Sequence, residues 1–206
     1  MAVISTFFST ALGVITALAL HRCKGKLRAL LAMLAYSPLV VPDILLGISM
    51  LLLFNNILIP LFSDLFQFLF GIKPDLGMTT IIIAHITFSM SYVTMVVLGR
   101  LQEFDRFLID AAHDLGANSL QTFFRVTLPV ISPAVIAGAL FSFTLSIDDF
   151  VITFFVKGAG DTTLPIFIQS EMRRGSPAMI SALSVVFLLM TFILVFITQK
   201  LLEKRK

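Results

Sequence analysis

Five long apolar runs limit what this chain can fold into. They cover residues 2–20, 29–53, 76–100, 126–156 and 175–199, and each holds no more than two charged residues. About 20 apolar residues in a helix cross a bilayer. The whole chain is 58% hydrophobic and 13% charged, with a mean hydropathy of +1.00, which is about half the charge of a water-soluble domain. The sequence therefore predicts an all-α, polytopic membrane helical bundle with five spans.

One further stretch, residues 58–70, is apolar but short. It contains Pro60 and Asp64. A run of this length is more typical of a re-entrant or interfacial segment than of a span. Residues 58–70 are therefore not predicted to form a span.

The distribution of Lys and Arg predicts the orientation. Residues 21–28 and 200–206 are rich in basic side chains, which favour the cytoplasmic side. With five spans, residues 100–125 fall on the same side, and the basic residues left outside are Lys73, Lys157, Arg173 and Arg174. The C-terminus is then cytoplasmic and Met1 is outside. Because the start of a protein usually stays inside, we expect that a helix preceding Met1 is missing from this chain.

The longest cytoplasmic connection, residues 101–129, is predicted to form two short helices. The first covers about 102–115 on three- and four-residue apolar spacing and stops at Gly116. Asn118 or Ser119 caps the second, and Leu128-Pro129 ends it. The small residues Ala111, Ala112 and Gly116 let another surface approach the backbone, and Asp110 can meet a basic partner. This pattern favours a docking site; an amphipathic connector lying on the membrane is the alternative.

Three carboxylates lie inside the predicted spans. Each Asp in mid-bilayer costs about 2.5–3.5 kcal/mol on insertion scales, so Asp148, Asp149 and Asp43 need a compensating role. A path for an organic cation supplies one, and we favour Asp148 or Asp149 over Asp43 as its lining. The alternative is that an Asp caps a broken helix, and Pro38 and Pro42 favour a break just before Asp43. A lone His85 in mid-span is more often a hydrogen-bonded packing residue than a pathway residue.

Several function classes are excluded by what the chain contains. The single Cys23 cannot form an internal disulfide or a multi-cysteine zinc site. A net charge of +3 does not indicate nucleic-acid binding, because the distribution of the basic residues is explained by the orientation of the spans in the membrane. The phosphate-binding G-x-x-x-x-G-K-[ST] motif does not occur, so a separate subunit must hydrolyse ATP if transport is active.

Two other functions are alternatives to transport. Gly158-Ala-Gly-Asp161 fits the G-x-G-D pattern of intramembrane aspartyl proteases, but Asp161 falls outside the fourth run and no Tyr-Asp pair supplies a second acid. A passive channel or an uncoupled scaffold subunit is the third possibility, and it has no use for a cytoplasmic docking segment.

The docking segment resembles a known motif. Asp110-Ala-Ala112, Gly116 and Leu128-Pro129 are similar to the EAA loop of binding-protein-dependent ABC importers, with Asp in place of the usual Glu. Within those importers, four stretches resemble the spermidine/putrescine permease family of the PotC type: 37–43, 84–88, 142–149 and 163–165. That family ordinarily has six spans, so its first helix has no counterpart here.

The resemblance implies a type I ABC importer transmembrane domain over residues 1–206, with 101–129 as its cytoplasmic coupling segment. It implies ATPase subunits that grip Asp110, Ala111, Ala112, Gly116, Leu128 and Pro129, a second permease subunit and an extracytoplasmic binding protein, all at the bacterial inner membrane. No cofactor is expected in this chain, because ATP and magnesium belong to the ATPase. The implied cargo is a polyamine; another cation or small solute is the alternative.

Overall fold

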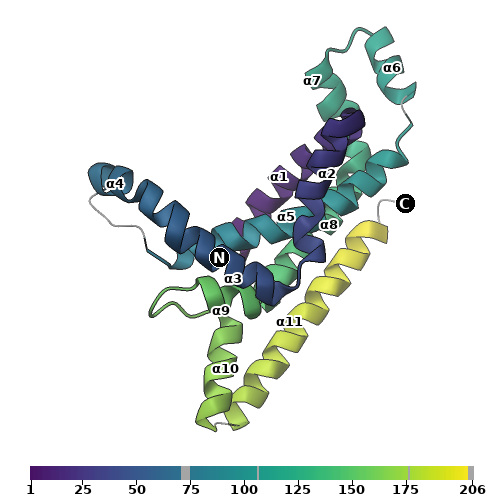
Figure 1. The fold of residues 1–206 in the computed structure, drawn as a ribbon. Helices are drawn as coiled ribbons and strands as arrows, with labels where there is room; N and C mark the ends of the chain where they lie inside the picture. Colours follow the sequence, from purple (N-terminus) through teal and green to yellow (C-terminus); the bar gives the residue numbers. More distant parts are fainter. Residues whose placement is uncertain (71–74, 106, 176, 204–206) are drawn as a thin grey trace.

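The protein is built from helices. The computed structural model describes residues 1–70, 75–105, 107–175 and 177–203, and every element in these ranges is helical (Figure 1). In chain order they are α1 (Ala2–Arg22), α2 (Gly25–Val40), α3 (Asp43–Leu53), the π-helical turn η1 (Phe54–Leu58), α4 (Ile59–Phe70), α5 (Met78–Gln102), α6 (Phe107–Asp114), α7 (Ser119–Thr122), the π-helical turn η2 (Phe123–Thr127), α8 (Leu128–Asp148), α9 (Val151–Val156), α10 (Leu164–Arg174) and α11 (Pro177–Glu203). The all-α prediction is confirmed.

The five predicted spans correspond only approximately to the helices. By length and composition, four described helical runs can cross a membrane: Ala2–Arg22, Asp43–Asp64, Met78–Gln102 and Ser119–Asp148. A shorter apolar helix, Met179–Ile193, lies within α11. The predicted run 29–53 is divided at Val41-Pro42, and 126–156 is broken at Asp149. The helix that starts at Asp43 continues into 58–70, so this stretch begins as part of a long apolar helix rather than as a separate segment.

Two prolines are accommodated by π-helical turns instead of ending their helices. η1 precedes Pro60, and η2 precedes Pro129. In each turn the closing N–H bonds five residues back, from Ile59 to Phe54 and from Leu128 to Phe123. A proline lacks an N–H and crowds the carbonyl four residues earlier, and the wider turn relieves both problems. The prediction that Leu128-Pro129 ends a helix is therefore wrong, because these residues open α8.

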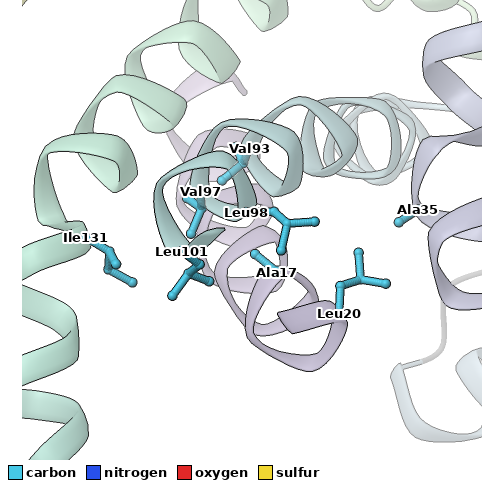
Figure 2. Packing of buried hydrophobic residues seen from close by; sticks show 8 residues of the cluster. All are labelled: Ala17, Leu20, Ala35, Val93, Val97, Leu98, Leu101 and Ile131. Atoms are coloured by element: carbon cyan, nitrogen blue, oxygen red, sulfur yellow. The ribbon is translucent and has the colours of Figure 1, made fainter. Parts of the chain in front are cut away.

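Helix α5 is the centre of the bundle. In the most apolar 18-residue stretch of α5, 56% of the residues are buried, whereas the buried share is 28% or less in the corresponding stretches of the other three long apolar runs. Its residues Val93, Val97, Leu98 and Leu101 pack with Ala17 and Leu20 of α1, Ala35 of α2 and Ile131 of α8 (Figure 2). A second cluster, around Ile81 and Phe88 of α5, joins α3 and α9.

Small residues let α1 and α8 approach α5 closely. A Cβ added to Gly13 of α1 would lie 2.7 Å from the Val93 side chain, and one added to Gly138 of α8 would lie 3.3 Å from it. Along α1 the buried residues Ser5, Ser9, Gly13 and Ala17 are all small and recur every four positions. Interfaces of small residues at four-residue spacing are typical of membrane helices, where close packing replaces the hydrophobic effect as the source of association.

The antiparallel register of α5 and α8 sets up the interior polar contacts. Val93 meets Gly138, and two turns away His85 meets Ser146. Residue numbers therefore increase along α5 in the direction in which they decrease along α8, so the two helices are antiparallel. The ends of the bundle are also distinct: α6 and α7 lie at the same end as the α1–α2 connection, and α9 lies at the other (Figure 1). The basic connection at residues 21–28 and the 101–129 segment therefore lie at the same end of the bundle.

Candidate functional site

The 101–129 segment folds as two helices joined by a tight turn, with boundaries that differ from the prediction. Gln102 ends α5, and the first short helix, α6, starts only at Phe107. Gly116 has a φ of +83°, and the N–H of Ala117 bonds the carbonyl of Ala112 at 3.0 Å. Glycine adopts this left-handed conformation without strain and commonly ends helices this way. The predicted stop at Gly116 is confirmed.

Asn118 is the predicted cap of the second helix, and this too is confirmed. Its Oδ1 accepts the backbone N–H of Gln121 at 2.9 Å, and Gln121 Oε1 accepts the N–H of Asn118 at 3.0 Å. This reciprocal pair is a capping box, which satisfies two otherwise unpaired donors. From Ser119 the helix then continues through η2 into α8. The turn after α6 is thus fixed at both sides, and α7 is joined rigidly to a long apolar helix.

The outer face of α6 and α7 is apolar and unusually exposed. Leu115 is 89% exposed, and Phe107, Leu108 and Leu120 are also exposed. Asp110, Ala111 and Gly116 lie exposed in the same segment, and nothing lies within 4 Å of a Cβ added to Gly116. Ala112, in contrast, is only 8% exposed and packs inward. Of the predicted docking residues, Asp110, Ala111 and Gly116 are available at the surface, and Ala112 supports it from beneath.

The two acids at the end of α8 have different surroundings. Asp148 is the last residue of α8 and is exposed. Asp149 has a side chain only 10% exposed, and it receives the N–H groups of Ile152 at 3.2 Å and Thr153 at 2.8 Å. The Thr153 hydroxyl also donates to it at 2.7 Å. Asp149 therefore satisfies the first turn of α9, which is the capping alternative foreseen for one of these acids.

Asp43 lies directly after the break between α2 and α3. α2 ends at Val40, Val41 and Pro42 are extended, and Asp43 is the exposed first residue of α3. The helix that Asp43 begins packs on the helix that follows Asp149, because a Cβ added to Gly47 would lie 2.7 Å from the Phe155 ring and 3.4 Å from Cα of Ile152. Two half-helices, each started by an acid, therefore pack together on one side of α5.

His85 is the polar residue whose contacts the sequence did not reveal. It is fully buried on α5 and contacts Ser146 of α8, Thr153 of α9 and the carboxylate of Asp149. The expectation of a hydrogen-bonded His is correct, but its partners depend on the helix register. In the sequence, the signals of this cluster are a lone His in mid-span and an acid within an apolar run, and neither shows that the two side chains meet.

The loop around Asp161 has a structural explanation. Asp161 lies between α9 and α10, outside the helices, as expected. A Cβ at Gly158 would collide with the carbonyl oxygen of Leu76, and one at Gly77 would lie 3.2 Å from Asp161 Oδ2. Gly158 of this motif and Gly77 before α5 therefore permit close packing of the two chain segments. Within the ranges that the structure describes, no three His, Cys, Asp or Glu side chains are grouped so that they could hold a metal ion.

Broken apolar helices with acids at the breaks, together with an exposed two-helix segment at one end of the bundle, are the features to be matched with known membrane proteins. The chain belongs to the family of binding-protein-dependent transport system inner membrane components, which matches residues 9–206. It is a multi-pass protein of that inner-membrane family, and nothing in the comparisons supports the protease interpretation.

Two relatives carry polyamine names. The putrescine transport system permease protein PotI of Escherichia coli K12 is 44% identical over 179 residues, which cover 86% of this chain and 60% of PotI. The spermidine/putrescine transport system permease protein PotC of the same organism is 35% identical over 199 residues, covering 97% of this chain and 70% of PotC. The chain thus spans 60% to 70% of the length of these relatives.

Solved structures of ABC transporters share the fold. A chain of the MetNI methionine ABC transporter in an inward-facing conformation superposes with a TM-score of 0.72 at 17% identity, covering 100% of this chain and 91% of that one. A chain of an amino acid ABC transporter gives a TM-score of 0.56 at 17% identity, covering 98% and 88%. The predicted importer-type transmembrane fold is confirmed.

Proposed function

We propose that this chain is a permease subunit of an ATP-driven ABC importer for polyamines and that it forms half of the translocation path. The names of PotI and PotC support the cargo. The observation that carries the proposal is the exposed Asp148 at the end of an otherwise apolar α8. An unpaired carboxylate there is unfavourable by about 2.5–3.5 kcal/mol on insertion scales, and a passing ammonium group offsets this.

The difference between the two neighbouring acids assigns them different roles. Asp149 is committed to the first turn of α9 by three hydrogen bonds. Asp148 is exposed and able to meet a cation, and Asp43 offers a second exposed carboxylate at the start of α3. A polyamine carries ammonium groups separated by methylenes, so it can exchange water for carboxylate oxygens while its apolar stretches pass apolar walls. We assign Asp148 first, and Asp43 second, to the substrate path.

The 101–129 segment is the coupling surface for the ATPase in this proposal. Asp110, Ala111 and Gly116 offer a small, acidic contact flanked by exposed Leu115 and Leu120. The segment connects α5 to α8, and these two helices pack directly on each other. A displacement of α6 and α7 by the ATPase therefore also moves α8, the helix that ends at Asp148.

The remaining partners follow from this role. ATP and magnesium bind the ATPase subunits, a second permease subunit completes the path, and an extracytoplasmic binding protein delivers the solute. The C-terminus of α11 lies in the cytoplasm, on the side of the basic clusters at residues 21–28 and 200–206.

Uptake by the complete importer tests this function. The chain is assembled with its partner subunits and binding protein in right-side-out membrane vesicles that contain ATP, and the uptake of labelled putrescine and spermidine is measured. Asp148→Asn should reduce uptake strongly. Asp64→Asn is the matched control, because Asp64 is an exposed acid within the apolar run 43–64 but away from both breaks. Equal uptake by both variants would remove Asp148 from the path, and uptake of a different solute alone would correct the cargo.

A further inference from the structure

One buried side chain on α5 holds both sides of the break between α8 and α9. His85 Nδ1 lies 2.8 Å from Ser146 Oγ in the last turn of α8. His85 Nε2 lies 2.9 Å from Thr153 Oγ1 in α9 and 3.2 Å from Asp149 Oδ2 between the two helices. We propose that His85 is a positioning residue that fixes the geometry of this break and thereby the direction in which Asp148 points.

The hydrogen bonds around the ring form a complete set for a neutral imidazole protonated on Nε2. The Thr153 hydroxyl donates to Asp149 Oδ2, so its oxygen is free to accept from Nε2–H. The Ser146 hydroxyl then donates to Nδ1. Every polar atom in the chain from Ser146 to Asp149 has a partner. A buried network in which each member is satisfied favours one geometry over its alternatives, since any rearrangement leaves a polar group unpaired in a low-dielectric interior.

This network controls Asp148 through its neighbours in the sequence. The backbone N–H of Asp149 makes the last bond of α8, to Leu145 at 3.1 Å, and Asp149 is then extended, with ψ of 120°. Ser146 and Asp149, two residues before and one after Asp148, are both held by His85. Asp148 itself is exposed and outside the network. Its direction therefore depends on the angle of the break, and the inference rests on the proposed role of Asp148 in the substrate path.

Two amide variants separate the contacts of the ring. The amide of His85→Gln reaches the position of Nε2 and can still donate to Thr153 and Asp149. The shorter His85→Asn reaches only the position of Nδ1 and keeps the contact with Ser146 alone. Ser89→Ala is the packing control: Ser89 lies one turn along α5, is fully buried, and its hydroxyl has no hydrogen-bond partner among the described residues.

The first measurement does not depend on the transported solute. Asp148→Cys is introduced into the chain with Cys23→Ser, in the complete importer in vesicles, and the labelling rate of residue 148 by a water-soluble cationic methanethiosulfonate is followed. We expect His85→Asn to change this rate by about tenfold, the effect expected when a hydrogen bond to a charged group is lost. His85→Gln and Ser89→Ala should stay within about twofold of the parent. Equal rates in all four proteins would overturn the proposal.

The second measurement uses putrescine uptake in the importer with native Asp148. His85→Asn should raise the half-saturating putrescine concentration by about tenfold with unchanged amounts of assembled permease, and His85→Gln should restore it. In an Asp149→Asn background, the effect of His85→Asn should largely vanish, because both changes break the same network. Loss of both His85 variants from the membrane, with Ser89→Ala retained, would show a packing role and overturn the proposal. Absence of putrescine uptake in the unmodified importer would reject the proposed function, and the labelling rates would still decide the role of His85.

Discussion

The hydroxyl oxygens of Ser9 and Ser142 lie 2.7 Å apart and join α1 to α8 inside the bundle. Ser9 Oγ also lies 3.1 Å from the carbonyl of Thr6, to which it can donate its proton. Either hydroxyl can be the donor in the contact between the helices; when Ser9 donates to Thr6, Ser142 donates to Ser9. Hydrogen bonds of this kind contribute modestly in membranes, because a serine separated from its partner can bond its own helix.

This contact predicts a small coupling energy. In the double-mutant cycle of Ser9→Ala and Ser142→Ala, we expect about 0.6 kcal/mol of interaction free energy. The measurement is the free energy of unfolding of the purified chain or complex in mixed micelles. A coupling near zero would show that close packing alone holds α1 against α8.

The approach of α1 to α5 predicts a much larger effect at Gly13. Gly13→Ala should destabilise the bundle by about 1–3 kcal/mol, because the new methyl group would overlap the Val93 side chain and lie 3.1 Å from the carbonyl of Met90. Gly99→Ala is the control, since nothing lies within 4 Å of its added Cβ and alanine favours the helix. Survival of the assembled protein after heating, measured by size-exclusion chromatography, should fall for the first variant only.

Neighbouring alanines in α6 should respond in opposite ways to a larger side chain. Ala112 is buried in α6, a helix that packs on α7 and η2, so Ala112→Leu should destabilise the segment by about 1–3 kcal/mol. Ala111 is exposed, so Ala111→Leu should leave stability unchanged but uncouple ATP hydrolysis from uptake. Thermal stability and coupled ATPase activity of the reconstituted importer are the two measurements. Normal coupling in Ala111→Leu would argue against docking of the ATPase at this surface.

Alanine substitutions of the two acids at the α8–α9 break should have different effects on stability and on uptake. Asp149→Ala removes the acceptor of two backbone N–H groups, so we expect about 0.5–2 kcal/mol of lost stability. Asp148→Ala removes an exposed carboxylate and should lower polyamine uptake with little change in stability. Heat survival and labelled-putrescine uptake, measured on the same preparations, compare the two. The reverse pattern would exchange the roles assigned here.

Local signals in the sequence predicted the turn of the 101–129 segment well. Gly116 ends α6 in the left-handed conformation, and Asn118 caps α7, because these conformations depend on the residue itself and its near neighbours. The prediction failed at Pro129, which opens α8 after a π-helical turn. A π-helical turn before the proline removes the clash with the carbonyl four residues earlier, which is what normally makes proline a helix breaker. The local sequence does not predict that a π-helical turn forms here.

The sequence by itself determined the membrane class, the helical content, the family resemblance and the presence of costly acids, since each follows from composition, apolar run length or a local motif. Only the tertiary structure decided that Asp149 is bound to α9 while Asp148 is exposed, and that His85 meets Ser146, Thr153 and Asp149. The reason is physical: these contacts depend on how α5 and α8 are aligned, and that alignment is set by the close approach of Gly138 to Val93, which lies 45 positions away in the chain.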